Sequence, residues 1–296
     1  INQQSPDGST TTLTIKAPRN NIIIEPTTTL NASGADASQS VGDTSTVTIE
    51  AYNITLGDST RIISGIGNDT TDSISVDGGD DSTFTLRAYQ NLTFGSNVKI
   101  EAYGGRGDES SGLGGDASIS IYGDIIDFGT NAYMRFSGGD NWGYTTDAAV
   151  GSSIVYINAT QLNMQNAVID AYGSQSDTLS TFTIQINPSA SNNTTTIYAS
   201  TIKGSDYFNL SSQSDVSILS STFDFDQNND GDLFIYNINN LLINNSNFQF
   251  DIGSPTLNFT SNKQTISGTN IDLANAGAVS SKFFSITPPF SAPKRC

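Results

Sequence analysis

The feature of this sequence that most constrains its fold is a repeat of about 35 residues. Short segments that alternate apolar and Ser/Thr residues recur as T-L-T-I-K-A from Thr12, T-V-T-I-E-A from Thr46, T-F-T-L-R-A from Thr83 and S-I-S-I-Y-G from Ser118, with looser copies from Ser153 and Thr181. Their first residues are 34, 37, 35, 35 and 28 positions apart. Alternation with a period of two is typical of a strand with one buried face, so each copy predicts a β-strand.

Two further strand-like pieces follow the copies. The second pieces are Ile22 to Ile24, Ile54 to Leu56, Leu92 to Phe94, Ile125 to Phe128 and Leu162 to Met164. The third pieces are I-E-A-Y-G-G from Ile100, M-R-F-S-G-G from Met134 and I-D-A-Y-G-S from Ile169. No helical apolar rhythm lies between the strands, which argues against βαβ crossovers. Three short strands per repeat predict one turn of a solenoid, in which Val47, Phe84 and Ile119 form one interior column.

From about residue 215 the repeat shortens, because Thr222, Asn247 and Asn270 hold equivalent places at spacings of 25 and 23 residues. We therefore predict an all-β chain with about 8–10 coils stacked as a single β-solenoid over residues 12–287. Residues 12–214 are expected to form long-looped coils, with the loops on one edge, and residues 215–287 compact coils. Residues 1–11 are expected to form an N-terminal arm and residues 288–296 a Pro-rich tail.

The x-φ-T-φ turns, the insertion A-Y-G-G-R-G-D-E-S-S-G-L-G-G-D-A and the N-N-S-N-F-type coils resemble the single-stranded parallel β-helix superfamily. This superfamily includes pectin-lyase-like enzymes, filamentous-haemagglutinin-like adhesins and phage tailspikes. The resemblance covers roughly residues 10 to 285 and implies a right-handed parallel β-helix. Because such folds host unrelated functions, it implies an architecture and leaves the activity open.

The composition excludes several classes of function. The 296 residues contain no His, which excludes imidazole-based triads and His-ligated metal sites. The net charge is -17 and the twelve basic residues are scattered, so neither nucleic acid nor an anionic membrane is an expected partner. No apolar run approaches the roughly 20 residues of a membrane span, so no membrane insertion is expected. The single cysteine, Cys296, excludes an internal disulfide.

Long insertions are expected to leave the coil at one corner. They run over about residues 31–45, 65–82, 104–117, 138–152 and 173–180. They are rich in Asp, and together they predict a stripe of acidic loops along one edge of the solenoid. Such a concentration of carboxylates suits calcium, which takes six to eight oxygen ligands, although Gly/Asp/Ser loops also serve simply as turns and for solubility.

The sharpest metal-like motif is D-Q-N-N-D-G-D-L, in which Asp226, Asn228, Asp230 and Asp232 match the first half of a calcium loop. Position twelve of that loop is Asn237 instead of a bidentate Glu, and no helices are expected to flank it. These departures exclude an EF-hand. The two remaining interpretations are a minimal calcium loop and an Asn/Asp/Gly turn.

Two other motifs concern the cell surface. Arg106, Gly107 and Asp108 spell the R-G-D tripeptide that integrins read, although three residues also match by chance. Ten N-x-[ST] sequons are candidate glycosylation sites: Asn31, Asn53, Asn68, Asn91, Asn158, Asn192, Asn193, Asn209, Asn244 and Asn258. Asn53 and Asn91 occupy the same place in successive turns, and their side chains are expected to project outward.

The candidates for catalysis are Arg87 and Arg135, because the resemblance to β-helix lyases implies an Arg or Lys base beside a carboxylate-bound calcium. The carboxylates nearest to them in the pattern are Asp80, Asp81, Glu101 and Asp170. Lys16, Glu50 and Tyr122 replace Arg87 in the aligned turns, as on an ordinary solvated face. No cluster of Arg, Lys and Asp is expected to recur over adjacent turns, so no residue is assigned as catalytic.

These observations favour an extracellular or cell-surface, non-catalytic β-solenoid with a structural or adhesive role. Open coil ends expose backbone edges that must be capped or stacked on a neighbour. The expected partners are copies of the chain in a head-to-tail filament joined by coil ends and terminal arms, or a surface carbohydrate or receptor. The alternative is a pectin-lyase-like polysaccharide lyase, or a carbohydrate-binding tailspike-like protein, that uses a carboxylate-bound calcium. Calcium is the only cofactor considered.

Overall fold

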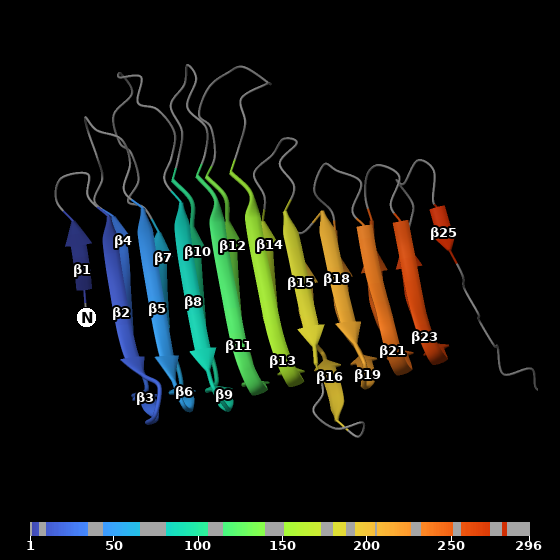
Figure 1. Cartoon of the computed structure of the whole chain (residues 1–296). Helices are drawn as coiled ribbons and strands as arrows, with labels where there is room; N and C mark the ends of the chain where they lie inside the picture. Colours follow the sequence, from blue (N-terminus) through green and yellow to red (C-terminus); the bar gives the residue numbers. More distant parts are fainter. Residues whose placement is uncertain are drawn as a thin grey trace, which may run out of the picture.

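The computed structural model describes residues 2–5, 10–34, 44–65, 81–105, 115–139, 151–172, 180–187, 193–204, 206–225, 232–250, 256–272 and 280–282. Within these ranges the regular structure is entirely β, without a helix. Figure 1 shows the strands side by side along one axis, from β1 (Asn2–Ser5) at one end to β25 (Ser280–Lys282) at the other. The prediction of an all-β chain is confirmed.

Each repeat contributes up to three successive strands. The first strands are β2 (Thr11–Ala17), β5 (Ser45–Ala51), β8 (Ser82–Ala88), β15 (Thr181–Ile186), β18 (Tyr207–Ser212) and β25. The second strands are β3 (Ile22–Ile24), β6 (Ile54–Leu56), β9 (Asn91–Phe94), β16 (Thr194–Tyr198) and β19 (Asp215–Leu219). Four longer strands supply both positions at once: β11 (Ala117–Phe128), β13 (Ser153–Gln165), β21 (Asp232–Asn244) and β23 (Thr256–Ser267). The third strands are β1, β4 (Thr29–Gly34), β7 (Arg61–Gly65), β10 (Lys99–Tyr103), β12 (Tyr133–Ser137), β14 (Val168–Tyr172), β17 (Thr201–Lys203), β20 (Thr222–Asp224), β22 (Asn247–Gln249) and β24 (Asn270–Asp272).

The strand pairing follows the repeat. The third strands form one sheet in the order β1-β4-β7-β10-β12-β14-β17-β20-β22-β24, and the first and second strands form a second sheet. Neighbours within each sheet run parallel, and each strand pairs with its equivalent in the adjacent repeat. This pairing is consistent with a solenoid. We call one passage through a first, second and third strand a coil; the described strands make nine complete coils, from β2–β4 to β23–β24, with β1 before them and β25 after them.

The interior is built from columns of apolar residues, one residue from each coil. Val47, Phe84 and Ile119 are register partners and are 0%, 0% and 1% exposed, which confirms the predicted interior column. Every second residue of a strand faces inward, so a slip of one residue would expose the whole set. Aromatic rings fill the compact coils, where Phe223 and Phe248 stack with centroids 4.8 Å apart.

One residue with a positive φ angle stands between the second and third strands of every complete coil. These residues are Thr27, Ser59, Asn97, Asn131, Asn166, Ala199, Ser220, Asn245 and Gly268. The left-handed conformation turns the chain sharply, and Asn and Gly adopt it at least cost. In the later coils a buried serine follows: the N–H of Ser200 donates to Ser221 Oγ and the N–H of Ser221 to Ser246 Oγ, both at 3.2 Å.

Replacing Ser221 by Ala should destabilise the protein by about 1–3 kcal/mol, because the buried N–H of Ser200 would lose the hydroxyl that accepts its hydrogen bond. The measurement is urea unfolding at equilibrium. Ser217→Ala is the matched control, since Ser217 lies on the preceding strand β19 between two buried residues and its side chain faces outward. Equal midpoints for the two variants would show that the buried serines contribute nothing to stability.

The structure adds detail at the predicted boundaries. Residues Asn2–Ser5, expected in the N-terminal arm, form β1 and pair with β4, with Asn2 opposite Asn31. The C-terminal tail, residues 288–296, and most of the long insertions lie outside the described residues. The strands on either side of these insertions are described, and so are the glycines at the points where two of the insertions leave and rejoin the coil.

Two insertions are held together, where they leave and rejoin the coil, by hydrogen bonds between backbone groups of glycines. The N–H of Gly115 donates to Gly105 O at 2.9 Å, and the N–H of Gly151 donates to Gly139 O at 3.2 Å. The N–H of Gly139 donates to Gly115 O at 2.8 Å and so links the two glycine pairs. A Cβ atom at Gly139 would overlap the carbonyl oxygen of Gly105, so these backbones approach too closely for any side chain there.

Gly139→Ala should therefore cost at least about 1–3 kcal/mol, because two backbone segments would have to separate. Thermal unfolding measures the loss. Gly65→Ala is the control, since its added Cβ would meet Tyr103 Cβ at 3.3 Å and should cost less. Comparable losses in the two variants would contradict the close approach at Gly139.

Candidate functional site

Charged side chains of alternating sign line the outer face of the third-strand sheet. Glu101 on β10 is the register partner of Arg135 on β12, Arg135 of Asp170 on β14, and Asp170 of Lys203 on β17. The preceding residues, such as Ile100 and Met134, face the core, and the pleat therefore turns these four outward. We call Glu101, Arg135, Asp170 and Lys203 the charged column.

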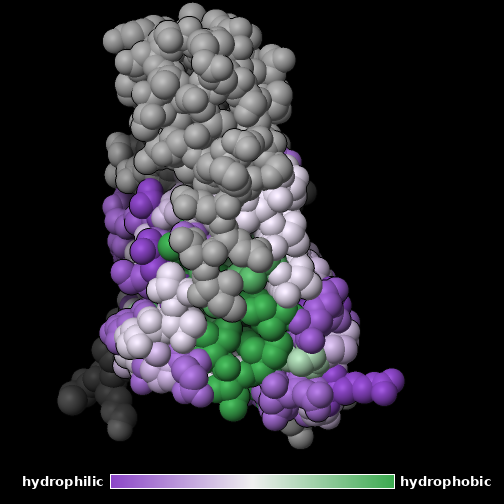
Figure 2. All heavy atoms as spheres, turned by 90° about the vertical axis from the view of Figure 1, so that its left-hand side faces the viewer, coloured by the Kyte–Doolittle hydropathy of each residue, from purple (hydrophilic) through white to green (hydrophobic). Residues whose placement is uncertain are grey.

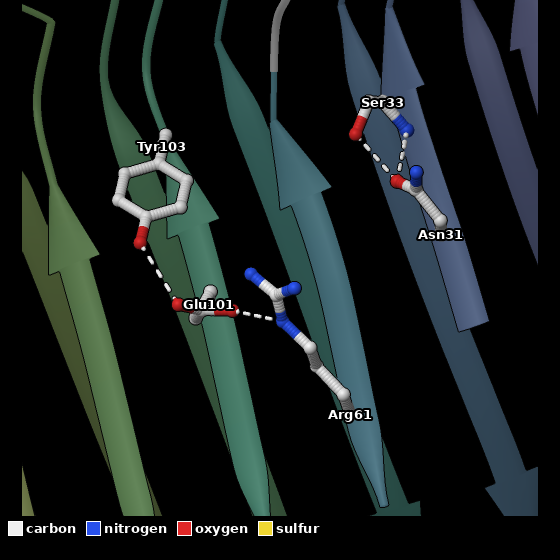
Figure 3. Close-up of polar contacts among 5 residues, drawn as sticks. All are labelled: Asn31, Ser33, Arg61, Glu101 and Tyr103. Atoms are coloured by element: carbon white, nitrogen blue, oxygen red, sulfur yellow. Dashed lines mark hydrogen bonds and ion pairs between the residues drawn. The ribbon is translucent and has the colours of Figure 1, made fainter. Parts of the chain in front are cut away.

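Glu101 is held by two neighbours (Figure 3). Its Oε2 lies 2.6 Å from Nε of Arg61 on the adjacent strand β7, and its Oε1 accepts a hydrogen bond of 3.2 Å from the Tyr103 hydroxyl. The Glu101 side chain is only 12% exposed, and the Arg61 side chain 50%. The carboxylate is thus largely shielded from solvent and neutralised by the protein itself.

Tyr103 and Arg135 extend this contact to the next coil. The guanidinium carbon of Arg135 lies 6.0 Å from the centroid of the Tyr103 ring, at the outer limit of a cation–π contact. Burial of Tyr103 and the negative charge of Glu101 raise the pKa of the Tyr103 hydroxyl to about 12, against the opposite effect of Arg135. Tyr103 is therefore held as a neutral hydrogen-bond donor to Glu101.

Asp170 is the most enclosed member of the charged column, with 5% of its surface exposed. Its Oδ2 lies 3.3 Å from Lys203 Nζ, and the Tyr133 hydroxyl lies 3.5 Å from the same oxygen. Burial of Tyr133, and secondly the charge of Asp170, raise the pKa of the Tyr133 hydroxyl. The other oxygen, Asp170 Oδ1, is buried without a hydrogen-bond partner. Lys203 supplies the opposite charge that a buried carboxylate requires.

The charged column contradicts the expectation that no cluster of Arg, Lys and Asp recurs over adjacent turns. That expectation was wrong because the variation at Arg87 that argued against a cluster lies on first strands, whereas these charges lie on third strands. The sequence does contain the signal: aligning I-E-A-Y from Ile100, M-R-F-S from Met134 and I-D-A-Y from Ile169 puts Glu101, Arg135 and Asp170 at one position.

The charged column contains carboxylates and an arginine, the residue types expected of a lyase site. Its carboxylates, however, form ion pairs with basic residues of the protein, as in a structural contact. Glu101 contacts Arg61 and Asp170 contacts Lys203, so each acid faces a base of the protein. No group of three or more His, Cys, Asp or Glu side chains in the described part of the chain could hold a metal ion.

Arg87, the other catalytic candidate, lies on the outer face of the first strands. Its guanidinium carbon stands 4.1 Å from the Tyr122 ring centroid. Lys16, Glu50, Arg87 and Tyr122 are successive register partners, which confirms their predicted alignment. Asp81 lies six residues before Arg87 along an extended segment, about 20 Å away, so the structure does not bring them together. Asp80 lies outside the described residues.

Carboxylates at the starts of first strands accept backbone hydrogen bonds from the next coil. Asp81 Oδ1 accepts from the Asp116 N–H at 2.8 Å, and Asp116 Oδ1 from the Ser152 N–H at 2.7 Å. Asp232, from the proposed calcium loop, accepts in the same way from the Thr256 N–H at 2.7 Å. The other members of that loop, Asp226, Asn228 and Asp230, and the R-G-D residues Arg106, Gly107 and Asp108, lie outside the described residues.

Eight of the ten sequons lie in the described ranges, and Asn68 and Asn192 lie outside them. Asn53 and Asn91 stand one above the other, as expected: Asn53 Oδ1 accepts from the Asn91 N–H at 3.0 Å, and Asn53 Nδ2 donates to Asn21 Oδ1 at 2.9 Å. Asn31 Oδ1 accepts from the Ser33 hydroxyl at 2.5 Å (Figure 3). The remaining described sequons are Asn158, Asn193, Asn209, Asn244 and Asn258, all of them partly buried. Glycosylation stays a prediction.

No protein-family model, curated protein or solved structure matches this chain. Among the described residues, no helical segment has the length and hydropathy of a membrane span. The likeness to the parallel β-helix superfamily therefore rests on the all-β structure and its long parallel sheets.

The raised pKa of Tyr103 gives a pH test of these contacts. The unfolded chain releases the phenol proton near pH ~10 and the folded chain near 12, so this group's contribution to stability is present below pH ~10 and is lost as the pH rises towards 12. Glu101→Gln should lower the pKa of Tyr103 in the folded protein, because it removes a negative charge. Ultraviolet titration of tyrosinate measures this, with Tyr103→Phe to assign the signal; an unchanged titration would contradict the coupling.

Proposed function

We propose that this protein is an extracellular, non-catalytic β-solenoid with a structural or adhesive role, a right-handed parallel β-helix whose copies stack into a cell-surface or secreted filament. The observation that carries this proposal is that strands at the ends of the stack lack a described partner on one side. Among the described strands, β2 and β3 pair on one side only, with β5 and β6. Unpaired strand edges readily accept another chain, which supports assembly through the coil ends.

Apolar side chains are also left partly uncovered at both ends. The residues that pack against the core without being fully buried are Ile15, Ala17 and Ile22 in the first coil and Ile266 and Ile271 in the last. Figure 2 looks onto the end formed by the first coil and shows apolar side chains gathered between polar ones. Contiguous exposed apolar surface is typical of interaction sites. A second copy would cover it.

The outer faces support a scaffold in preference to an enzyme. Arg61 and Lys203 form ion pairs with Glu101 and Asp170, and Arg87 stacks on the Tyr122 ring. Each of these three basic side chains thus has a partner within the protein. The extracellular location rests on the sequons and the Ser/Thr/Asn-rich surface. An adhesive role would add a surface carbohydrate or receptor as a partner.

The second candidate is a polysaccharide lyase or tailspike-like carbohydrate-binding protein that uses calcium. The observation that favours it is the placement of Arg135 between Glu101 and Asp170 on adjacent coils. Its test is the release of unsaturated products from acidic polysaccharides with and without calcium. Product release that disappears in Arg135→Gln would overturn the non-catalytic proposal.

The filament is tested by negative-stain microscopy and light scattering of the purified protein over a range of concentrations. Rods that lengthen with concentration are expected. Ile22→Lys places a charge at the open end and should shorten them at least tenfold, whereas Ile154→Lys, at an exposed position on β13 in the middle of the stack, should not. Both variants must keep the parental melting temperature within a few degrees. Monomers at every concentration would contradict the proposal.

A further inference from the structure

The two ends of the stack are stepped in complementary ways. At the beginning, the third-strand sheet extends one strand beyond the first complete coil, because β1 stands before β4 while no described strand stands before β2 or β3. At the other end, the first-strand column extends one strand beyond the last complete coil, because β25 pairs with β23. Figure 1 shows β1 and β25 at opposite ends of the stack.

We propose that β25 of one copy and β1 of the next supply the first and third strands of one composite coil at the joint between copies. This inference rests on the proposed filament and specifies its contact. In the joint, β25 would pair with β2 of the next copy and β24 with its β1. Each of these four strands thereby gains a parallel partner on the side where no described strand pairs with it.

Because a different sheet extends further at each end of the stack, only certain ends of two copies can form the joint. Two first-coil ends would each bring a third strand to the joint, and the first-strand position would stay empty. Two last-coil ends would bring two first strands and no third strand. Only unlike ends complete the coil, and they keep all strands parallel, as in the interior of the stack. Such a contact does not close on itself, so it adds copies without limit along the axis.

The columns predict the register of the joint. Ser280 pairs with Thr256, and that column runs back through Thr181 and Thr46 to Thr12. Ser280 of one copy should therefore lie opposite Thr12 of the next. In the third-strand sheet, Asp272 ends the column that contains Asn31, the partner of Asn2, so Asp272 should lie opposite Asn2. No described residue occupies the second-strand position of the composite coil.

The joint also covers apolar surface. The column that starts at Ile15 and Ile49 continues coil by coil to Phe259, and the column of Leu30 ends at Ile271. At an end-to-end contact, the partly exposed residues of the first coil would face the interior of the joint. The composite coil stands between these residues, with Ser281 in the column of Leu257 and Gln3 in the column of Ala32. Phe259 of one copy and Ile15 of the next would therefore lie two strand spacings apart, about 9.6 Å, on either side of that coil. Burial of these side chains would favour association.

Disulfide trapping tests the register. In a Cys296→Ser background, the pair Thr12→Cys and Ser280→Cys should form disulfides between copies. Paired strands lie about 4.8 Å apart, within the ~4.4–6.8 Å of Cα atoms in a disulfide. Within one chain the two positions stand at opposite ends of the stack (Figure 1), so intramolecular closure is excluded. Mild oxidation of the assembled protein should give a ladder of covalent dimers, trimers and longer species on a non-reducing gel.

The matched control is Thr14→Cys with Ser280→Cys, which moves one thiol about 6.6 Å along the strand and should reduce crosslinking at least tenfold. Rods in the microscope with no ladder from Thr12→Cys and Ser280→Cys would overturn the composite coil while leaving the filament intact. Equal ladders from the two pairs would overturn the proposed register. Absence of rods and of crosslinks would overturn both the joint and the filament.

Discussion

The whole structure depends on parallel hydrogen bonding between successive coils, which places each residue directly over its equivalent about 4.8 Å away. Side chains therefore meet their own counterparts, and residue types that interact well with themselves are favoured. Phe223 stacks on Phe248, and Asn53 donates to Asn21. The abundance of uncharged polar residues in this chain follows from the same constraint, because Asn and Ser can donate to a copy of themselves whereas like charges repel.

In the charged column the charges of successive coils alternate in sign, so that like charges do not lie opposite each other. Glu101, Arg135, Asp170 and Lys203 follow one another on four successive coils, so each charge has an opposite charge beside it. Asp170 can be buried on the outer face because Lys203 compensates it. A column of this kind stabilises the stacking order of particular coils, since a coil moved by one position would meet a like charge.

Much of the fold follows from the sequence, and the physical reason is the period of two. The alternation in T-V-T-I-E-A predicts which side of the strand is buried, and the stacking of Val47 on Phe84 follows once the repeats are aligned. The fusion of first and second strands into β11 and β13, the burial of Asp170 and the pairing of β1 with β4 could not be predicted in this way. They depend on contacts between coils, and insertions of unequal length hide from the sequence which residues share a column.

A stack of equivalent coils has no intrinsic end, and this creates the central physical problem of the fold. Each added coil buries the edge of the previous one and exposes an identical edge of its own, so the free energy of the open surface does not fall as the chain lengthens. Ile15 and Ile22 at one end and Ile271 at the other remain partly uncovered for this reason. In the proposed joint, β1 and β25 of neighbouring copies would complete one coil, so the parallel strand pairing would continue from one copy into the next.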